Sequence, residues 1–380
     1  MIDASIYGIV ALSRVAFQIG TSMLERREQY DEIEYPKATL VIACYNEPAR
    51  LFERALQSFA NQTYKDLEVI VVDDGSKNAG SIRRITKKYG FTYIYQKNAG
   101  KREAMFTAFK HMSKDSQVVL TADSDTLWHP NASKELVKVL LSDESIGAVT
   151  GEVAVLNEKE NFLTQLIAIR YHIAFQHERA SQSYFNKVTC VSGPLGAYRR
   201  EIINQVKYRF INQFFFGKKC TYGDDRHLTN LVLDMGYDVK YAQNALCHTY
   251  APAQFSKLVK QQTRWSKSYW REIVWQLRVI PKHGIYMAYD WTISFILPFL
   301  LTFAVAGHIL HISNGSLQHL VLLPLTIVFM SFIRLVEPLI RTKRPVYMLF
   351  IFYAFIYFAV MLPSKFWALA TINDGKWGTR

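Results

Sequence analysis

Short apolar runs alternate with amphipathic stretches between Ala38 and about Leu246. Three of these runs, TLVIACYNE, LEVIVVDDGS and VVLTADSDT, pass directly into acidic or polar residues. A short apolar run with a polar end is typical of a buried strand, and strands that alternate with amphipathic helices form a largely parallel sheet. The pattern predicts an α/β domain over residues 38–250. Its acidic side chains should lie at the carboxyl edge of the sheet, where open α/β sheets bind ligands.

The pattern changes after this domain. Residues 255–283 are expected to form a basic amphipathic helix in the membrane interface, because the apolar residues share one helical stripe and most basic residues lie elsewhere. The stripe holds Phe255, Leu258, Val259, Trp265, Tyr269, Ile273 and Leu277. Residues 159–176 show a weaker form of the same pattern. For both segments, packing against the soluble domain is the alternative.

Three apolar stretches follow, at about residues 285–310, 319–336 and 346–370. Each is long enough to cross about 30 Å of hydrocarbon. The loop HISNGSLQ has no Lys or Arg, whereas IRTKRP has three, so the positive-inside rule predicts that the stretches at 285–336 cross and return. The stretch at 346–370 contains Pro363 and Lys365, and we expect an interfacial or re-entrant segment that keeps residues 371–380 on the cytosolic side.

The start of the chain, the charge and the cysteines add smaller constraints. Residues 1–30 contain Arg14 within an apolar run and lack a basic start and a cleavage site, which favours an anchor helix over a signal peptide. The net charge of +13 suits anionic substrates, lipid head groups or nucleic acid without choosing among them. The four cysteines lie far apart, so neither a zinc site nor a disulfide framework is indicated. A reducing, cytosolic setting is expected for the α/β domain.

Pairs of acids follow two of the predicted strands. Asp73 and Asp74 lie where a strand ends and a turn begins at Gly75, so a carboxylate there could hold a base or a ribose. A simple turn or a helix cap is the alternative. Asp123 and Asp125 have one residue between them, so both can face one side of a strand end. Oxygen ligands spaced in this way suit Mg²⁺ or Mn²⁺ already bound by a diphosphate.

Further charged residues stand at predicted helix starts. Asp224 and Asp225 lie between a glycine and a helix in TYGDDRHLTN, where one could take a proton from an acceptor hydroxyl and either could cap the helix. Lys101 and Arg102 follow Gly100 and could contact phosphate oxygens or remain solvated.

QQTRW, residues 261–265, joins a guanidinium to an indole on the predicted interface helix. Arg264 could neutralise a phosphate. Trp265 could offer an apolar face to a sugar ring or anchor the helix at the lipid head groups. Both interpretations remain open from the sequence.

These motifs occur in series: the strand-end acids, GKRE, DSDT, SGPLGAYRR, GDDRHLTN, QQTRWSKSYWRE and WGTR. In this order they resemble the membrane-embedded family 2 glycosyltransferases, and within them the hyaluronan synthases. The resemblance runs from about Ala38 to Arg380 and is densest between Lys97 and Glu272. It implies a GT-A type domain with amphipathic interface helices and C-terminal transmembrane helices, in the plasma membrane with the catalytic domain in the cytosol.

The resemblance also implies roles for single residues. The UDP-sugar would be bound by Tyr45, Asp73, Asp74, Lys101, Asp123, Arg264, Trp377 and Arg380, the last two in a tail, residues 371–380, that closes over the nucleotide. Asp225 would be the catalytic base, and Asp125 would hold Mg²⁺ or Mn²⁺. The acceptor would be bound by Ser192, Gly193, Pro194 and Trp265.

The function implied is a processive, inverting transfer that polymerises UDP-N-acetylglucosamine and UDP-glucuronate into hyaluronan at the membrane lipid, with export of the nascent polysaccharide. A cation should then meet the glucuronate carboxylate, and the candidates are Arg170, Arg199 and Lys267. A chitin-type synthase that uses UDP-N-acetylglucosamine alone is one alternative. A catalytically silent protein that binds nucleotide or carbohydrate is the other, and the retention of every acid argues against it. No nucleic-acid partner is expected, because the positive charges concentrate at membrane-proximal helices and loops.

Overall fold

The computed structural model describes residues 2–25 and 29–374. Within this part of the chain, eight strands form one sheet in the order β3-β2-β1-β4-β7-β6-β10-β5. Their bounds are β1 Ala38–Cys44, β2 Leu67–Asp73, β3 Thr92–Tyr95, β4 Val118–Asp123, β5 Leu127–Trp128, β6 Ile146–Val155, β7 Gly196–Arg199 and β10 Asp238–Thr249. A separate hairpin joins β8 Phe214–Phe215 to β9 Lys218–Lys219.

The sheet confirms the α/β prediction but is more mixed than expected. Strands β3, β2, β1 and β4 pair in parallel, as do β6 and β10. Strand β7 lies antiparallel between β4 and β6, and Gly196 at its start is opposite Thr121 near the carboxyl end of β4. The chain must turn at this edge to enter β7, so residues 192–195 lie beside the ends of the parallel strands.

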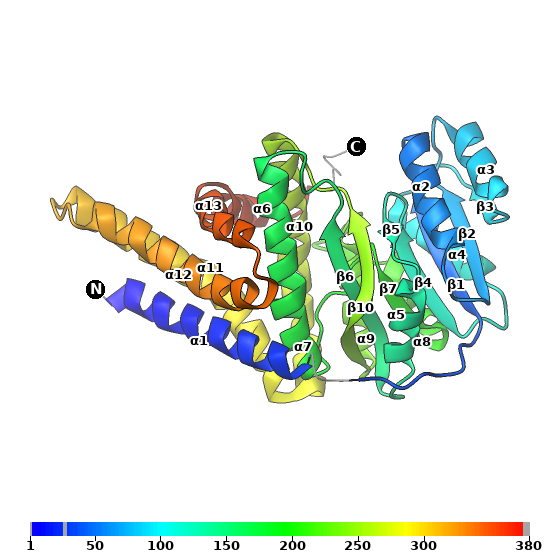
Figure 1. Cartoon of the computed structure of the whole chain (residues 1–380), viewed down its shortest axis with the longest axis horizontal. Helices are drawn as coiled ribbons and strands as arrows, with labels where there is room; N and C mark the ends of the chain where they lie inside the picture. The colour runs from blue at the N-terminus through cyan, green and yellow to red at the C-terminus, as the bar shows by residue number, and fades with distance from the viewer. Residues whose placement is uncertain (1, 26–28, 375–380) are drawn as a thin grey trace.

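Helices cover both faces of the sheet (Figure 1). They are α2 Ala49–Ala60, α3 Ala79–Lys88, α4 Lys101–His111, α5 Ala132–Leu140, α8 Arg200–Ile211 and α9 Asp224–Asp234. Because both faces are covered, consecutive residues of the central strands are buried, among them Leu40, Ile42 and Leu120. This explains why the strands read as continuous apolar runs.

Two longer helical elements stand between the sheet and the apolar helices (Figure 1). The first is α6 Phe162–Ile173, which continues through a π-helical turn, Ala174–Arg179, into α7 Ala180–Tyr184. It begins at a capping box in which the side chains and backbones of Asn161 and Thr164 bond reciprocally. The element therefore runs eight residues beyond the predicted end at residue 176. Its residues Leu166, Ile169 and Ile173 pack against the last apolar segment.

The second element is α10 Phe255–Trp275. Its Lys267 and Arg271 are 7% and 3% exposed, whereas Phe255 and Trp265 are 48% and 43% exposed. Burial of the two basic residues is possible because Arg271 binds a backbone oxygen of the α/β domain and Lys267 binds oxygen atoms of Asp374. The helix therefore does not divide into an apolar protein face and a basic outer face.

Long apolar helices extend from one side of the sheet (Figure 1). They are α1 Ile2–Glu25, α11 Ile280–Ser313 and α12 His319–Thr342. Gly284, with φ 72° and ψ −165°, interrupts α11 close to the predicted start of the first crossing stretch. These three helices and the segment Pro345–Ala370 are each long and apolar enough to span a membrane.

The segment after α12 is not one regular helix. It consists of a 3-10 turn Pro345–Leu349, α13 Phe350–Ile356, a π-helical turn Tyr357–Met361 and α14 Leu362–Ala370. At its start, Arg344 lies 3.7 Å from Glu158 of the α/β domain. Beyond its end, the carbonyl of Asp374 accepts a 3.0 Å hydrogen bond from the Tyr222 hydroxyl. Both ends of the segment therefore contact the α/β domain.

Candidate active site

A cavity of about 1100 Å³ opens at the carboxyl edge of the sheet. It reaches from Tyr45 and Asp74 at the end of the parallel strands to Arg14 and Asp290 on the apolar helices. The predicted residues that line it are Tyr45, Asp74, Lys101, Asp123, Asp125, Ser192, Gly193, Pro194, Asp225, Arg264 and Trp265. Residues far apart in the sequence thus line one cavity.

Three predicted residues are not placed there. Trp377 and Arg380 lie outside the described residues. Asp73 is completely buried and does not line the cavity. Its carboxylate accepts hydrogen bonds from the Ser76 backbone at 2.9 Å and the Tyr93 hydroxyl at 2.8 Å. The predicted contact of Asp73 with the UDP-sugar is therefore corrected: Asp73 stabilises the turn after β2.

The carboxylate of Asp74 holds the loop in front of α4. It accepts hydrogen bonds from Gln96 Nε2 at 2.7 Å and from the backbone amides of Ala99 and Gly100 at 2.9 and 2.8 Å. A Cβ at Gly75 would lie 2.7 Å from a backbone nitrogen of this loop, so the close approach requires glycine. Asp74 therefore fixes the start of the helix that carries Lys101.

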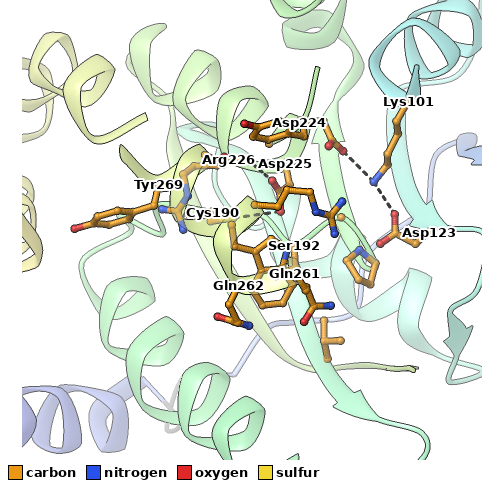
Figure 2. A pocket seen from close by; sticks show the side chains of 18 of the residues that line it. Lys101, Asp123, Cys190, Ser192, Asp224, Asp225, Arg226, Gln261, Gln262 and Tyr269 are labelled. Atoms are coloured by element: carbon orange, nitrogen blue, oxygen red, sulfur yellow. Dashed lines mark hydrogen bonds and ion pairs between the residues drawn. The ribbon is translucent and has the colours of Figure 1, made fainter. Parts of the chain in front are cut away.

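Lys101 joins two acids that the sequence places far apart. Its ammonium lies 2.6 Å from Asp123 Oδ1 and 2.9 Å from Asp224 Oδ2 (Figure 2). Burial acts to lower the pKa of Lys101, but the two carboxylates outweigh it and raise that pKa. Lys101 is therefore a permanent positive charge at the centre of the acidic cluster.

The end of β4 fits a divalent cation. Asp123 and Asp125 supply the hard oxygen atoms that Mg²⁺ and Mn²⁺ prefer, and Asp123 already stabilises a positive charge. A Cβ at Gly193 would lie 3.3 Å from the Lys101 ammonium and 3.5 Å from the Asp123 carboxylate, so glycine keeps this space open. No group of three His, Cys, Asp or Glu side chains with ligand spacing occurs in residues 2–25 and 29–374. Further ligands would have to come from a bound molecule.

Asp224 and Asp225 begin α9, but neither is its N-cap, because that position is Gly223. Burial acts to raise the pKa of Asp224, and the Lys101 charge reverses this and lowers it. Burial and then the Asp224 charge raise the pKa of Asp225. Adjacent carboxyls with opposite shifts are typical of a divided function, and Asp225 is the one suited to accept a proton.

Asp225 faces the cavity with few contacts to its carboxylate oxygens (Figure 2). Its Oδ1 accepts a 2.7 Å hydrogen bond from the Arg226 backbone amide, and its Oδ2 lies 3.8 Å from the Cys190 thiol. Cys190 lies two residues before Ser192, where the predicted acceptor loop begins. Its place at the site was not predicted from the sequence. Asp225 and the predicted acceptor residue Ser192 therefore line the same cavity.

Two buried arginines hold the turn that carries these acids. The carbonyl of Tyr222 accepts hydrogen bonds from Arg102 at 3.0 Å and from Arg271 at 2.7 Å. The Arg271 guanidinium also lies 4.4 Å from the centre of the Tyr222 ring. Arg102 is therefore used inside the protein rather than on a phosphate. This arrangement could not be predicted from the sequence, because the three residues lie in separate elements.

Gly223→Ala is expected to destabilise the protein. The residue has φ +78°, which costs a non-glycine residue roughly 1–2 kcal/mol. The new Cβ would also lie 2.0 Å from Ser268 Oγ, and such overpacking typically costs about 1–3 kcal/mol. The thermal midpoint of the purified variant measures the loss. Ser268→Gly in the same background should recover only the overpacking part, and an unchanged midpoint in Gly223→Ala would contradict the geometry.

The predicted acceptor loop is fixed at both ends. The Ser192 amide donates to Thr150 Oγ1 at 3.0 Å, and Trp128 Nε1 donates to the Pro194 carbonyl at 2.9 Å. Across the cavity, α10 contributes Arg264 and Trp265. An indole that is 43% exposed on a cavity wall can stack on a sugar ring.

The chain was compared with known proteins. Residues 36–268 match the family described as "Glycosyltransferase like family 2". Hyaluronan synthase 2 of Rattus norvegicus is 32% identical, with 98% of this chain and 76% of that protein covered. Hyaluronan synthase 3 of Homo sapiens is 33% identical, with coverage of 90% and 69%.

Among solved structures, a mannosyltransferase from Pyrobaculum calidifontis, in complex with GDP-Man and Mn²⁺, superposes with a TM-score of 0.64. It covers 97% of this chain and 99% of its own, at 20% identity, so this likeness shows the fold. The two kinds of comparison agree with the GT-A arrangement of strands. The chain belongs to the family 2 glycosyltransferases and is a membrane-associated, UDP-sugar-dependent enzyme of the hyaluronan synthase type.

Proposed function

We propose that this enzyme polymerises UDP-N-acetylglucosamine and UDP-glucuronate into hyaluronan and exports the product through its own apolar helices. The observation that carries the proposal is the single cavity, which runs from the strand-end acids to Arg14 and Asp290 on α1 and α11. A polymer extended at Asp225 would already lie at the mouth of the helical part. The hyaluronan synthases that the chain resembles support the choice of sugars.

In the proposed reaction, Asp225 takes the proton from an acceptor hydroxyl as its oxygen attacks the anomeric carbon of the donor. The attack comes from the face opposite UDP, the bond from that carbon to the diphosphate oxygen breaks, and the anomer inverts. Lys101 and Arg264 neutralise the departing diphosphate, and Trp265 supports the acceptor ring. A divalent ion held at Asp125, with Asp123 beside it, would stabilise negative charge on the leaving group as a Lewis acid.

The C-terminal tail is proposed to close over the nucleotide. The last described residue, Asp374, is bound by Tyr222 and by Lys267, whose ammonium lies 3.5 Å from an Asp374 carboxylate oxygen. Tyr222 lines the cavity, and its partner Asp374 precedes Trp377 and Arg380 by only a few positions in the sequence. This supports their proposed contact with bound UDP.

The proposed orientation places the catalytic domain in the cytosol and the enzyme in the plasma membrane. Both ends of the segment at 345–370 contact the catalytic domain, so this segment can enter and leave the lipid on one side. Residues 280–342 would then form the hairpin that crosses and returns. The basic residues around 341–344 lie on the cytosolic side in this arrangement.

One experiment tests donor use and export together. Purified enzyme in sealed proteoliposomes receives Mg²⁺ or Mn²⁺ and one or both donors outside, and UDP release and polymer length are measured. We expect long polymer only with both donors, and external hyaluronidase should leave the fraction in the lumen intact. Polymer from UDP-N-acetylglucosamine alone would favour a chitin-type synthase. Complete digestion by external enzyme would argue against coupled export.

A further inference from the structure

Most cations that line the cavity already bind an oxygen of the protein. These pairs are Arg14 with Asp290, Lys101 with Asp123 and Asp224, Arg102 with the Tyr222 carbonyl, Arg170 with Glu178, Arg179 with Gln182, and Lys219 with Glu103. Arg226 and Lys365 differ from this set. Within residues 2–25 and 29–374, the side chain of neither forms a hydrogen bond or an ion pair with a protein oxygen, and each lies instead near an aromatic ring.

Arg226 and Lys365 both lie close to one aromatic ring. The Arg226 guanidinium lies 5.7 Å from the centre of the Tyr269 ring, and the Lys365 ammonium lies 4.6 Å from it. The Tyr269 hydroxyl donates a 2.5 Å hydrogen bond to the Ser294 carbonyl on α11, which fixes the ring. Cation–π contacts stabilise each cation modestly but engage none of its N–H donors. An anion that reached both would gain from two charges at once.

The place of this cluster relates it to the reaction. Arg226 directly follows Asp225, and Figure 2 shows its side chain running from the base toward Tyr269. Lys365 comes from the apolar segment at 345–370, where a charged side chain is costly and normally faces a polar interior or a functional pathway. All three side chains line the same cavity. The cluster thus lies between the reacting end of the cavity and its helical part.

We propose that Arg226, Tyr269 and Lys365 form a subsite for the carboxylate of the glucuronate unit next to the reacting hydroxyl. The proposal rests on the proposed function and assigns its acidic sugar to particular residues. The carboxylate accepts charge-assisted hydrogen bonds from the guanidinium and the ammonium, and the tyrosine ring packs against the sugar. A neutral polymer of N-acetylglucosamine would offer neither cation a carboxylate. The subsite therefore distinguishes acidic from neutral chains.

The three cations expected from the sequence do not serve this role as placed. Arg170 lies 3.1 Å from Glu178. Arg199 donates to the backbone carbonyls of residues 140, 143 and 146, away from the cavity. Lys267 is buried against Asp374. Each already has an oxygen partner, so the earlier expectation is corrected in favour of Arg226 and Lys365.

The test measures binding rather than turnover. Purified full-length protein is titrated with a hyaluronan tetrasaccharide and with chitotetraose, and the two dissociation constants are compared. Lys365→Met should weaken hyaluronan binding roughly 10- to 100-fold, the range for loss of a hydrogen bond to a charged group. Chitotetraose binding should stay within about twofold, since no charge is lost from that contact. Lys365→Arg keeps the charge and should retain most of the preference.

Controls separate this inference from folding and from the proposed function. Lys260→Met removes an exposed lysine of α10 that does not line the cavity and should leave both affinities unchanged. UDP binding by Lys365→Met shows that the variant is folded. If Lys365→Met keeps the wild-type affinity for the hyaluronan tetrasaccharide, or weakens both sugars equally, the subsite is refuted. Polymer from UDP-N-acetylglucosamine alone in the donor experiment would instead refute the proposed function.

Discussion

Asp225→Asn is expected to remove nearly all turnover, with a loss of about 10²- to 10⁴-fold, the usual contribution of a positioned general base. An amide keeps the size of the side chain and its contact with the Arg226 amide but cannot accept the acceptor proton. The rate of UDP release at saturating donor measures the loss. Burial and the Asp224 charge raise the pKa of Asp225. As the pH is lowered, the wild-type rate should therefore begin to fall at a higher pH than it would with an aspartate of ordinary pKa.

The control for this variant is nucleotide binding. UDP should bind Asp225→Asn almost as tightly as it binds the wild type, because the carboxylate faces the acceptor side of the cavity. Asp115→Asn changes an exposed acid far from the cavity and should leave the rate unchanged. Turnover near the wild-type level in Asp225→Asn would reject its assignment as the base.

Lys101→Met is expected to have the next largest effect. It removes the ammonium between Asp123 and Asp224, so two carboxylates at 2.6 and 2.9 Å lose their counter-charge. A charge-assisted hydrogen bond to a diphosphate contributes about 1.5–3 kcal/mol, so UDP affinity should fall roughly 10- to 100-fold. Calorimetric titration with UDP and Mn²⁺ measures this change.

The same substitution should move the pH dependence. The Lys101 charge lowers the pKa of both Asp224 and Asp225, so its removal raises both, and the acid side of the rate profile should shift to higher pH. Lys97→Met, an exposed lysine in the preceding loop, provides the matched control. Unchanged UDP affinity together with an unchanged profile would show that Lys101 does not act at the nucleotide.

The strand-end acids could be predicted because each belongs to a local pattern. An apolar run followed by Asp-x-Asp or Asp-Asp shows where a strand stops, and parallel strands bring their ends to one edge. The choice between Asp73 and Asp74 could not be made in this way. Adjacent residues at a strand end point in opposite directions, and only the structure shows that Asp73 faces the interior.

Contacts between distant elements were also beyond prediction. The pairing of Arg271 with Tyr222 joins residues 49 positions apart, and neither has a local signature. The pairing of Lys365 with Tyr269 depends on how the apolar segment folds back onto α10. Both contacts depend on how the helices pack in three dimensions. The pattern of apolar and basic residues predicts that a helix lies at an interface, but it does not show which residues that helix contacts.

The hydrogen bond from Arg271 to the Tyr222 carbonyl affects whether the α/β domain can be separated from the helices that follow it. The match to the glycosyltransferase family covers residues 36–268 and so ends before Arg271. A soluble fragment cut after β10 would keep the sheet and all of its strand-end acids, yet the turn bearing Asp225 would be supported from α4 alone. The helix that supplies Arg271, α10, is also the one proposed to lie in the membrane interface, so detaching the enzyme from a bilayer would be expected to loosen the turn that carries the proposed base.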